Sequence, residues 1–456
     1  MHHLILGAGP AGVLAAETIR KHKPQDAITI VGDEREAPYS RMAIPYLLMG
    51  NIGESGTWLR KGQDHYQALG IRLVQARAKS VDTEQRTVAL DTGEPLCFDT
   101  LLIATGSQPM RPPIPGLDLP GVHPCWTLED ARKIMLLAVK GARVLQMGAG
   151  FIGCIIMESL VARGVHLSVV EMGDRMVPRM MGPTAGGMIK DWCEAKGVSV
   201  YTGARVEAVE RPETPAAAEP GLLGKIVQAL GFGADPAPAV PAAPMTVRLS
   251  TGKRVSVDLV ISATGVKPAI GFLETSGITC LQGVLTDEYM QTNVAGVYSA
   301  GDCAEAFDKI SGKTIVSAIQ PNAAEQARVA ALNMAGQSAV LRGVTQINVL
   351  DTLGLISTSF GDWQGVPGGE QVELTDRQAG RHLSLQFKDD VMVGCNSIGW
   401  TAHVGVLRGL VEGQVRLGAW KDELVKDPTR LVEAYIASAQ AQNLWQGAAD
   451  AHRRLA

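Results

Sequence analysis

The residues whose types and spacing suggest a functional site lie directly after the first apolar stretch of the chain. Gly7, Gly9 and Gly12 form a G-x-G-x-x-G turn with Pro10 and Ala11 inside it, and a helical pattern follows at once. Such a turn lets the backbone bend tightly at the first glycine, approach a pyrophosphate at the second, and pack helix against strand at the third. The free N–H groups and the positive dipole end of the helix then face the phosphates. The pattern predicts a dinucleotide site.

An acidic residue is expected where the ribose of that dinucleotide would lie. A second apolar run, 27–31, leads to Asp33 and Glu34, about 20 residues beyond the last glycine, where a ribose-binding acid belongs. Either acid can serve, and the sequence does not separate them. The alternative, a glycine-rich turn in some other α/β protein, is weakened by the complete context of strand, turn, helix and acid.

The same pattern occurs a second time. Residues 142–147 predict a strand, and the turn that follows contains Gly148, Gly150, Phe151, Ile152 and Gly153. Two dinucleotide sites in one chain mean two dinucleotides, and the simplest pair is a bound flavin plus a nicotinamide.

The acid that follows the second turn is Glu171, at the end of the predicted strand 165–170. Its carboxylate is expected to accept hydrogen bonds from the 2′- and 3′-hydroxyls of the adenosine ribose and to repel a 2′-phosphate, which favours NAD(H) over NADP(H). Arg175 and Arg179, a few residues further on, weaken this preference slightly.

Several later strands also end in residues suited to a nucleotide site. These strand ends are Ala104-Thr105-Gly106, Thr264-Gly265 and Gly301-Asp302. A carboxylate placed like that of Asp302 can accept hydrogen bonds from ribityl hydroxyls. A helix expected from Gln320 and Pro321 to residue 335 obeys the start and stop rules, and its positive end would face flavin N1 and O2. The alternative for that helix is ordinary packing.

Length and composition limit the class of protein. The 456 residues predict two to four domains, and a net charge of −4 favours neither nucleic acid nor an anionic membrane as partner. No apolar run approaches the roughly 18 residues of a membrane span, and the first strand begins too early to leave room for a signal peptide. The seven cysteines form no C-x-x-C or longer cluster, which argues against a zinc site, an iron–sulfur site or a disulfide framework and suits a cytoplasmic protein.

Two stretches stand apart from the nucleotide motifs. Residues 71–98 alternate apolar and polar positions and predict a small antiparallel meander. Residues 211–245 are rich in alanine and proline and interrupt a predicted hairpin, so they form an insertion. Its interpretation stays open between a disordered linker and a short apolar helix, within 221–232, that docks on a partner subunit.

The motifs together resemble those of a known group. The two G-x-G-x-x-G turns, the two Ala-Thr-Gly strand ends and Gly301-Asp302 are similar to the two-dinucleotide-binding-domain flavoproteins of the pyridine nucleotide-disulfide oxidoreductase superfamily, over residues 1 to about 335. The segment 38–41 resembles the NADH:rubredoxin, nitrite and ferredoxin reductase branch. Closer still are the FAD- and NAD-binding subunits of phenylglyoxylate dehydrogenase and tungsten aldehyde oxidoreductase complexes.

This resemblance implies an α/β fold of two Rossmann-like dinucleotide-binding domains, one inserted in the other. The residue pattern of the tail adds a C-terminal α+β interface domain. FAD is expected on residues 1–113 and 267–337, and NAD(H) on residues 114–266. Residues 338–456 form the C-terminal domain, with strands over 347–400 and helices over 402–452, and its default role is an oligomer or subunit interface.

The departures from the family pattern are informative. Residues 35–60 contain no cysteine, and Cys154 and Cys193 are not spaced as a redox pair, so no thiol of this chain is expected to relay electrons. Related reductases carry a lysine and a glutamate where this chain has Tyr46 and Ile155. The joint absence of the lysine and the glutamate has a physical reason, because either charge alone would be buried without a partner.

Arg41 and Tyr46 are the candidate catalytic residues, in a segment that can lie along a bound flavin or form an ordinary surface crossover. We expect an FAD-dependent NAD(H) oxidoreductase that exchanges single electrons with an iron–sulfur protein or a subunit of a larger complex, such as an aldehyde or 2-oxoacid oxidoreductase, without a metal of its own. It is expected to be a hetero-oligomer or a homodimer. The alternatives are a stand-alone NADH oxidase or small-molecule reductase, and a non-catalytic interaction protein.

Overall fold

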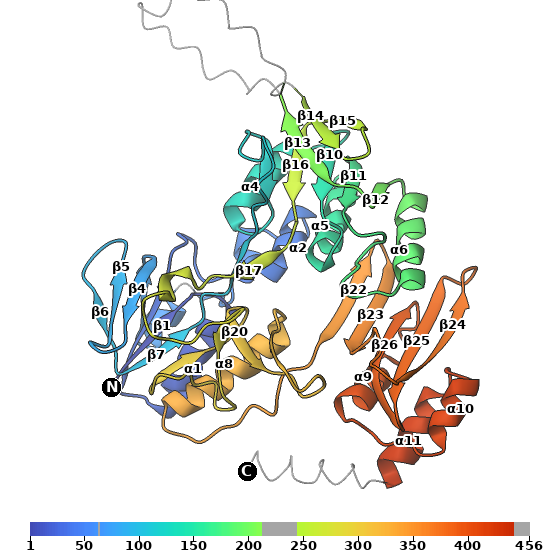
Figure 1. The fold of residues 1–456 in the computed structure, drawn as a ribbon. Coiled ribbons are helices and arrows are strands. Elements are labelled where there is room, and N and C mark those ends of the chain that lie inside the picture. Colours follow the sequence, from blue (N-terminus) through green and yellow to red (C-terminus); the bar gives the residue numbers. More distant parts are fainter. Residues whose placement is uncertain (63, 212–243, 442–456) are drawn as a thin grey trace, which may run out of the picture.

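The computed structural model describes residues 1–62, 64–211 and 244–441, which form three lobes (Figure 1). Two lobes are built on five-stranded parallel sheets and the third on a five-stranded antiparallel sheet. The insertion predicted at 211–245, with its apolar segment 221–232, lies outside the described residues except at its ends. The last part of the predicted C-terminal helical region, beyond 441, lies outside them as well.

The first lobe combines the beginning of the chain with residues from much later in it. Its sheet has the order β19 (Val297–Ser299), β7 (Thr100–Ile103), β1 (His2–Leu6), β2 (Ala27–Gly32) and β3 (Ile71–Gln75). Ile5 faces a core formed with α1 (Pro10–His22) and α8 (Gln320–Met334), whereas Leu4 and Leu6 face a second core on the other side. A parallel strand buried on both faces is a continuous apolar run, which explains the Leu-Ile-Leu sequence before the first turn.

The meander predicted over residues 71–98 is wrong at its start. β3 (Ile71–Gln75) is a parallel edge strand that pairs with β2, and the antiparallel meander contains only β4 (Ala78–Asp82), β5 (Thr87–Leu90) and β6 (Leu96–Cys97). β3 has one buried residue and several exposed ones, a pattern that a half-solvated antiparallel strand can also show. The sequence pattern alone did not separate the two arrangements.

The second lobe repeats this plan. Its sheet has the order β12 (Ser199–Thr202), β11 (His166–Glu171), β10 (Arg143–Met147), β16 (Leu259–Ser262) and β9 (Val122–Pro124). The helices α4 (Leu128–Leu137), α5 (Phe151–Ala162) and α6 (Pro183–Ala195) contribute to the core on one face. The other face is covered by an antiparallel sheet of β13 (Val206–Glu210), β14 (Met245–Leu249) and β15 (Arg254–Val257). The hairpin predicted on either side of the insertion is thereby confirmed.

The chain passes between these two lobes twice, and the two passages lie side by side. β8 (Ser107–Pro109) and β17 (Val266–Pro268) pair in antiparallel fashion. One Rossmann-like unit is therefore inserted in the other, as the sequence predicted. The first lobe is completed by β18 (Val284–Leu285), β20 (Ala304–Phe307), β21 (Thr314–Val316) and the short elements α3 (His65–Ala68) and η3 (Gly271–Leu273).

The C-terminal lobe is an antiparallel sheet with helices on one face. The sheet order is β22 (Ile347–Thr352), β23 (Leu355–Gly361), β26 (Val391–Ile398), β25 (Arg381–Lys388) and β24 (Glu370–Asp376). The helices are α9 (Val404–Glu412), α10 (Trp420–Lys426) and α11 (Leu431–Ala441). β22 lies against α5 and β26 against α6, so this lobe docks on the second lobe (Figure 1).

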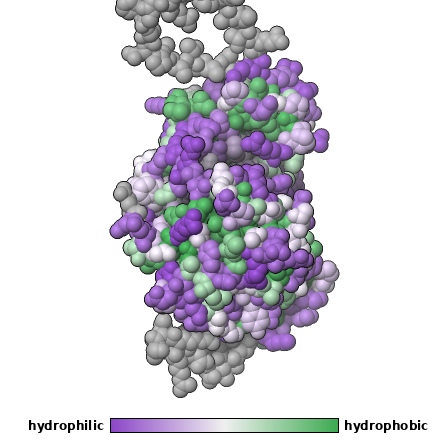
Figure 2. Space-filling view, turned by 90° about the vertical axis from the view of Figure 1, so that its left-hand side faces the viewer, coloured by the Kyte–Doolittle hydropathy of each residue, from purple (hydrophilic) through white to green (hydrophobic). Residues whose placement is uncertain are grey.

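The face of the molecule in Figure 2 is predominantly hydrophilic, with apolar side chains gathered in patches over its middle and upper parts. Within the described ranges, no helix combines the length and the apolar character that crossing a membrane requires.

Candidate functional site

The first glycine turn has a geometry that only glycine satisfies at two of its three positions. Gly7 has a φ of +119°, and a Cβ there would lie 2.0 Å from the carbonyl oxygen of Ala104. A Cβ at Gly12 would lie 1.9 Å from the carbonyl oxygen of Gly7. At Gly9, by contrast, a Cβ would meet nothing within 4 Å. The turn is closely packed at its first and third glycines and open beside its second. A pyrophosphate requires this open space to approach the backbone.

The second turn repeats this arrangement. Gly148 has a φ of +95°, and its Cβ would lie 2.4 Å from the carbonyl oxygen of Ala263. A Cβ at Gly153 would lie 2.6 Å from the carbonyl oxygen of Gly148, whereas Gly150 is open.

The helices that follow the turns leave their first N–H groups without side-chain caps. α1 begins after Gly9 and α5 after Gly150, and neither helix has a side-chain N-cap. α8, which opens with Gln320 and Pro321, lacks one too. In contrast, α4 carries a complete capping box between Thr127 and Asp130. The uncapped N-termini of α1 and α5, at the carboxyl ends of the parallel strands β1 and β10, are suited to anionic groups.

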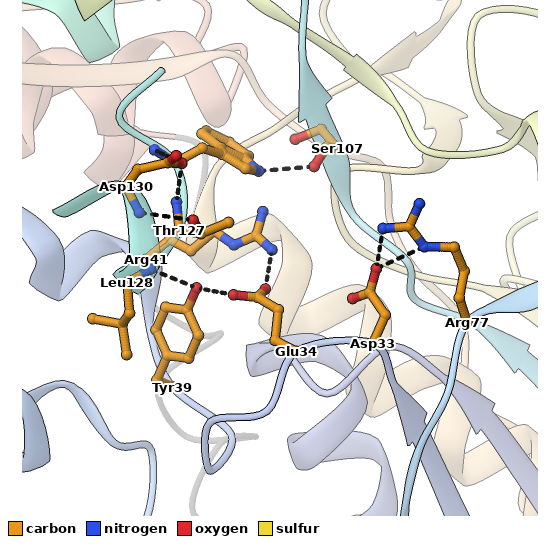
Figure 3. A network of polar contacts seen from close by, with 10 residues as sticks. Asp33, Glu34, Tyr39, Arg41, Arg77, Ser107, Thr127, Leu128 and Asp130 are labelled. Atoms are coloured by element: carbon orange, nitrogen blue, oxygen red, sulfur yellow. Dashed lines mark hydrogen bonds and ion pairs between the residues drawn. The ribbon is translucent and has the colours of Figure 1, made fainter. Parts of the chain in front are cut away.

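The two acids after β2 make different contacts, and their side chains point to different partners in Figure 3. Asp33 accepts hydrogen bonds from Arg77 at 2.7 and 3.0 Å. Glu34 accepts a hydrogen bond of 2.5 Å from the Tyr39 hydroxyl and one of 2.6 Å from Arg41. These contacts do not decide which of the two acids binds the ribose, so both Asp33 and Glu34 stay predicted ribose-binding residues.

Glu171 lies beside the second glycine turn. One of its carboxylate oxygens accepts a hydrogen bond from the Ala149 N–H at 2.8 Å, and the other accepts one from the Gly173 N–H at 2.8 Å. Arg175 donates to the Met181 carbonyl at 2.8 Å and pairs with Asp174 at 2.7 Å. Its charge is therefore engaged within its own loop.

Asp302 is held at the junction of β7 and β8. The Ser107 hydroxyl donates to its carboxylate at 2.8 Å. Burial raises the pKa of Asp302, whereas the Ser107 hydrogen bond and the positive charge of Arg41 lower it. The adjacent Gly301 has a φ of +83°, and its N–H donates to the buried Gln326 of α8 at 2.8 Å. Thr105 donates to the Ala269 carbonyl at 2.9 Å, which ties the two chain passages together.

The predicted catalytic residues lie between the two parallel-sheet lobes. Arg41 opens η1 (Arg41–Ala43) and Tyr46 lies in α2 (Ile44–Leu48), which packs against α4 and α5. The Tyr46 side chain is 54% exposed. Ile155, the other departure from the family pattern, is partly buried against the core of the second lobe, as are Phe151 and Ile152.

Sequence reasoning missed two residues that the structure brings into this region. The Trp126 indole N–H donates to the Ser107 carbonyl at 3.0 Å, and its ring lies under the Arg41 guanidinium, 5.0 Å from it. Trp126 lines a small hollow together with Cys125, Ile152 and Gly265. The capping signal of Thr127 and Asp130 locates the start of α4 in the sequence, but nothing local reveals the contact with Ser107.

The cysteines near the site are held as neutral thiols. All seven cysteines are free. Burial raises the pKa of Cys125 and of Cys154 to about 12, and it also raises the pKa of Cys303. Among the residues that the structure describes, no group of three or more His, Cys, Asp or Glu side chains is placed to hold a metal ion.

Comparisons with known proteins agree with this geometry. Residues 1–331 match the family model described as pyridine nucleotide-disulphide oxidoreductase. The epsilon subunit of NADH-dependent phenylglyoxylate dehydrogenase from Aromatoleum evansii is 29% identical over 429 residues, covering 93% of this chain and 95% of that protein. An NADH oxidase from Methanocaldococcus jannaschii is 31% identical over 424 residues, covering 88% of each.

A solved structure has the same fold. The covalent putidaredoxin reductase–putidaredoxin complex matches with a TM-score of 0.82 and 21% identity, covering 96% of this chain and 99% of that one. Two Rossmann-like units, one inserted in the other, are the fold of these reductases, and the chain belongs to the pyridine nucleotide-disulphide oxidoreductase family. It is an FAD-dependent NAD(H) oxidoreductase.

Proposed function

We propose that this protein is the NAD(H)-binding flavoprotein subunit of a larger oxidoreductase complex, which exchanges single electrons with an iron–sulfur protein or subunit. One observation carries this proposal. The likeness to the phenylglyoxylate dehydrogenase subunit covers 93% of the chain, so it extends past residue 331, where the family match ends, into the C-terminal lobe. Because the C-terminal lobe resembles part of a subunit of a multisubunit enzyme, we infer that its surface contacts other subunits.

In this proposal the two glycine turns hold the two dinucleotides. Gly7, Gly9 and Gly12, with Pro10 and Ala11, hold the FAD pyrophosphate at the start of α1, and Asp302 accepts hydrogen bonds from the ribityl chain. The uncapped start of α8 would face the flavin and would favour negative charge on it.

The second turn, with Glu171, holds NAD(H) at the start of α5, an arrangement supported by the open space beside Gly150. FAD, when bound, supplies the hydride acceptor and separates a two-electron transfer into single-electron steps. The protein contributes orientation and electrostatics.

The state of the cysteines supports an electron acceptor outside this chain. A thiol whose pKa is about 12, such as that of Cys125 or Cys154, stays protonated near pH 7, and the thiolate is the reactive form. Residues 35–60, which leave the first nucleotide-binding strand, contain no cysteine. Electrons from the reduced flavin are therefore expected to leave without a thiol intermediate.

A second candidate function is a self-contained NADH oxidase. The 31% identity to the Methanocaldococcus jannaschii enzyme favours it, because that likeness also covers most of the chain. The acceptor distinguishes the two candidates, since an oxidase passes electrons from the flavin directly to oxygen.

The test compares acceptors and partners in one preparation. Affinity-tagged protein is isolated under anaerobic conditions from its native source, and co-purifying proteins are identified by mass spectrometry. The flavin is then reduced by NADH in a stopped-flow instrument and reoxidised by a ferredoxin, by the co-purified subunit or by oxygen. Stoichiometric recovery of an iron–sulfur subunit with faster reoxidation by it supports the proposal. Isolation without such a subunit, together with faster reoxidation by oxygen, supports the oxidase.

A further inference from the structure

Trp126 joins the second lobe to residues of the first. It lies between β9 (Val122–Pro124) and α4 (Leu128–Leu137), both elements of the second lobe. Its side chain contacts Arg41, a predicted flavin-site residue, and Ser107, which binds the predicted flavin-site residue Asp302.

The ring and the N–H of Trp126 make separate contacts. The Arg41 guanidinium lies over the ring at 5.0 Å from its centroid, and the same guanidinium donates to Glu34 at 2.6 Å. The indole N–H donates to the Ser107 carbonyl at 3.0 Å, and the Ser107 hydroxyl donates to Asp302 at 2.8 Å. The ring therefore orients a cation, and the N–H orients the residue that binds the partly buried carboxylate of Asp302.

The position of Trp126 is itself fixed. Asp130 accepts hydrogen bonds from the backbone N–H groups of Trp126 at 3.2 Å and of Thr127 at 2.9 Å, and so closes the capping box of α4. The next residue, Leu128, donates its N–H to the Tyr39 hydroxyl at 3.3 Å. Figure 3 shows this chain of contacts from α4 through Tyr39 to Glu34 and Arg41.

We propose that Trp126 is a positioning residue of the flavin site, which fixes Arg41 through its ring and Ser107, and hence Asp302, through its indole N–H. The proposal depends on FAD binding alone and not on the identity of the electron acceptor.

The test uses two substitutions that separate the two contacts. Trp126→Phe keeps a ring under Arg41 and loses the N–H, so the dissociation constant for FAD should rise about threefold. Trp126→Leu loses both contacts, and the constant should rise by about tenfold or more. Arg41 is a cation beside the predicted flavin site, and the reduced flavin is the more negative redox form. A fivefold larger loss of affinity for the reduced form in Trp126→Leu would lower the two-electron midpoint potential by about 20 mV.

Trp192 provides the matched control. Its indole N–H also donates to a backbone carbonyl, that of Leu353 at 3.1 Å, and Lys196 lies 4.7 Å from its ring centroid. Trp192→Phe and Trp192→Leu remove the same kinds of contact at the junction with the C-terminal lobe. They should lower the melting temperature. The FAD dissociation constant should stay within twofold of the parent value, and the midpoint potential within a few millivolts of it.

A double-mutant cycle shows whether the effect passes through Arg41. In an Arg41→Gln background the ring has no guanidinium to hold, so Trp126→Leu should then weaken FAD binding only about threefold, as Trp126→Phe does. FAD affinity and potential that are unchanged in both Trp126 variants, or changed equally in the Trp192 variants, would overturn the proposal. If Trp126→Leu does not fold, Trp126→Phe and the Trp192 pair still decide it. Failure here leaves the proposed function intact, because both readouts are independent of the acceptor.

Discussion

At the scale of single residues, the glycines of the first turn divide into two kinds. A Cβ at Gly9 would meet open space, whereas a Cβ at Gly12 would lie 1.9 Å from the Gly7 carbonyl oxygen. Gly9→Ala should therefore fold with a nearly unchanged melting temperature but lose most of its FAD, because the methyl group occupies the space beside the turn. Gly12→Ala should fail to fold or unfold far earlier, because its methyl group clashes with the backbone. Flavin absorbance per protein and thermal unfolding check both outcomes, and a Gly9→Ala protein that retains full FAD would contradict them.

Glu171 is expected to select between the two nicotinamide cofactors. Glu171→Gln keeps an oxygen that can accept the hydrogen bond from Ala149 and removes the negative charge. The ratio of kcat/KM for NADPH to that for NADH should rise about tenfold, because the repulsion of a 2′-phosphate is lost. Steady-state kinetics with both cofactors measure the ratio. A parent protein that already prefers NADPH tenfold would show that Glu171 does not have this role.

The residue scale also shows where sequence reasoning ends. The glycines and acids were found because their spacing along the chain reflects one strand, turn and helix. Ser107 and Trp126 were missed because their partners are distant in sequence, as with Ser107 and Asp302, which are 195 positions apart. Only the fold brings such residues together.

At the scale of secondary-structure elements, α2 contains Tyr46, whose predicted role beside the flavin can be tested. Tyr46 is 54% exposed on this helix, which packs against α4 and α5 between the two lobes. Tyr46→Ala should slow flavin reduction by NADH several-fold, because an aromatic face that helps to orient the stacked rings is lost. Stopped-flow absorbance measures that rate. Tyr289→Ala, at another exposed tyrosine, is the control, and an unchanged rate and flavin spectrum for Tyr46→Ala would count against the hypothesis.

A buried histidine in β25 is expected to make the C-terminal sheet less stable in acid. The His382 ring accepts or donates a hydrogen bond with Thr375 at 2.9 Å, and burial lowers its pKa, with Glu373 acting in the opposite direction and Arg377 adding to the lowering. A histidine with a lowered pKa in the folded state contributes stability above its ordinary pKa of about 6.5, and that stability is lost as the pH falls further. The slope is at most about 1.4 kcal/mol per pH unit.

His382→Asn removes the titrating group from that sheet. In a thermal-unfolding series between about pH 6.5, the ordinary pKa of histidine, and about pH 5, its melting temperature should fall less steeply than that of the parent. Identical slopes for the parent and His382→Asn would mean that His382 does not titrate in this range.

Buried helices and central strands were easier to predict from the sequence than the edge strand β3. The long helices α1, α5 and α8 and the central strands were expected, because burial on one or both faces imposes a clear period on the sequence. The edge strand β3 was assigned to the wrong sheet, since its pattern of one buried and several exposed residues fits both arrangements. Cytoplasmic location, the domain boundaries and the role of the insertion stay predictions.

At the scale of the whole molecule, polar contacts between lobes fix their arrangement. Arg132 of α4 donates to Glu54 at 2.7 and 2.8 Å and to Glu36 at 2.7 Å, both in the first lobe. Arg163, at the end of α5, donates to the carbonyls of Leu48, Met135 and Ala138 at 2.8–2.9 Å and so joins the ends of α2 and α4. Such contacts carry no periodic signal, and the sequence predicted the lobes without predicting how they meet.

A buried amide bridges the junction between the second lobe and the C-terminal lobe. Asn396 accepts a hydrogen bond from the Gly182 N–H at 2.9 Å and donates to the Met180 carbonyl at 2.9 Å, and its side chain is buried. Asn396→Ala leaves both backbone groups without their partner, so it should lower the free energy of unfolding by about 1–3 kcal/mol in urea titrations.

Asn293 makes the same two kinds of hydrogen bond, from the Thr279 N–H and to the Gly277 carbonyl, within an exposed loop of the first lobe. Water replaces the lost partner there, so Asn293→Ala should change stability by less than about 0.5 kcal/mol. If the C-terminal lobe also carries the partner interface, Asn396→Ala should weaken capture of the iron–sulfur subunit while leaving NADH reduction of the flavin unchanged. Loss of flavin reduction together with partner capture would instead place this junction within the catalytic unit.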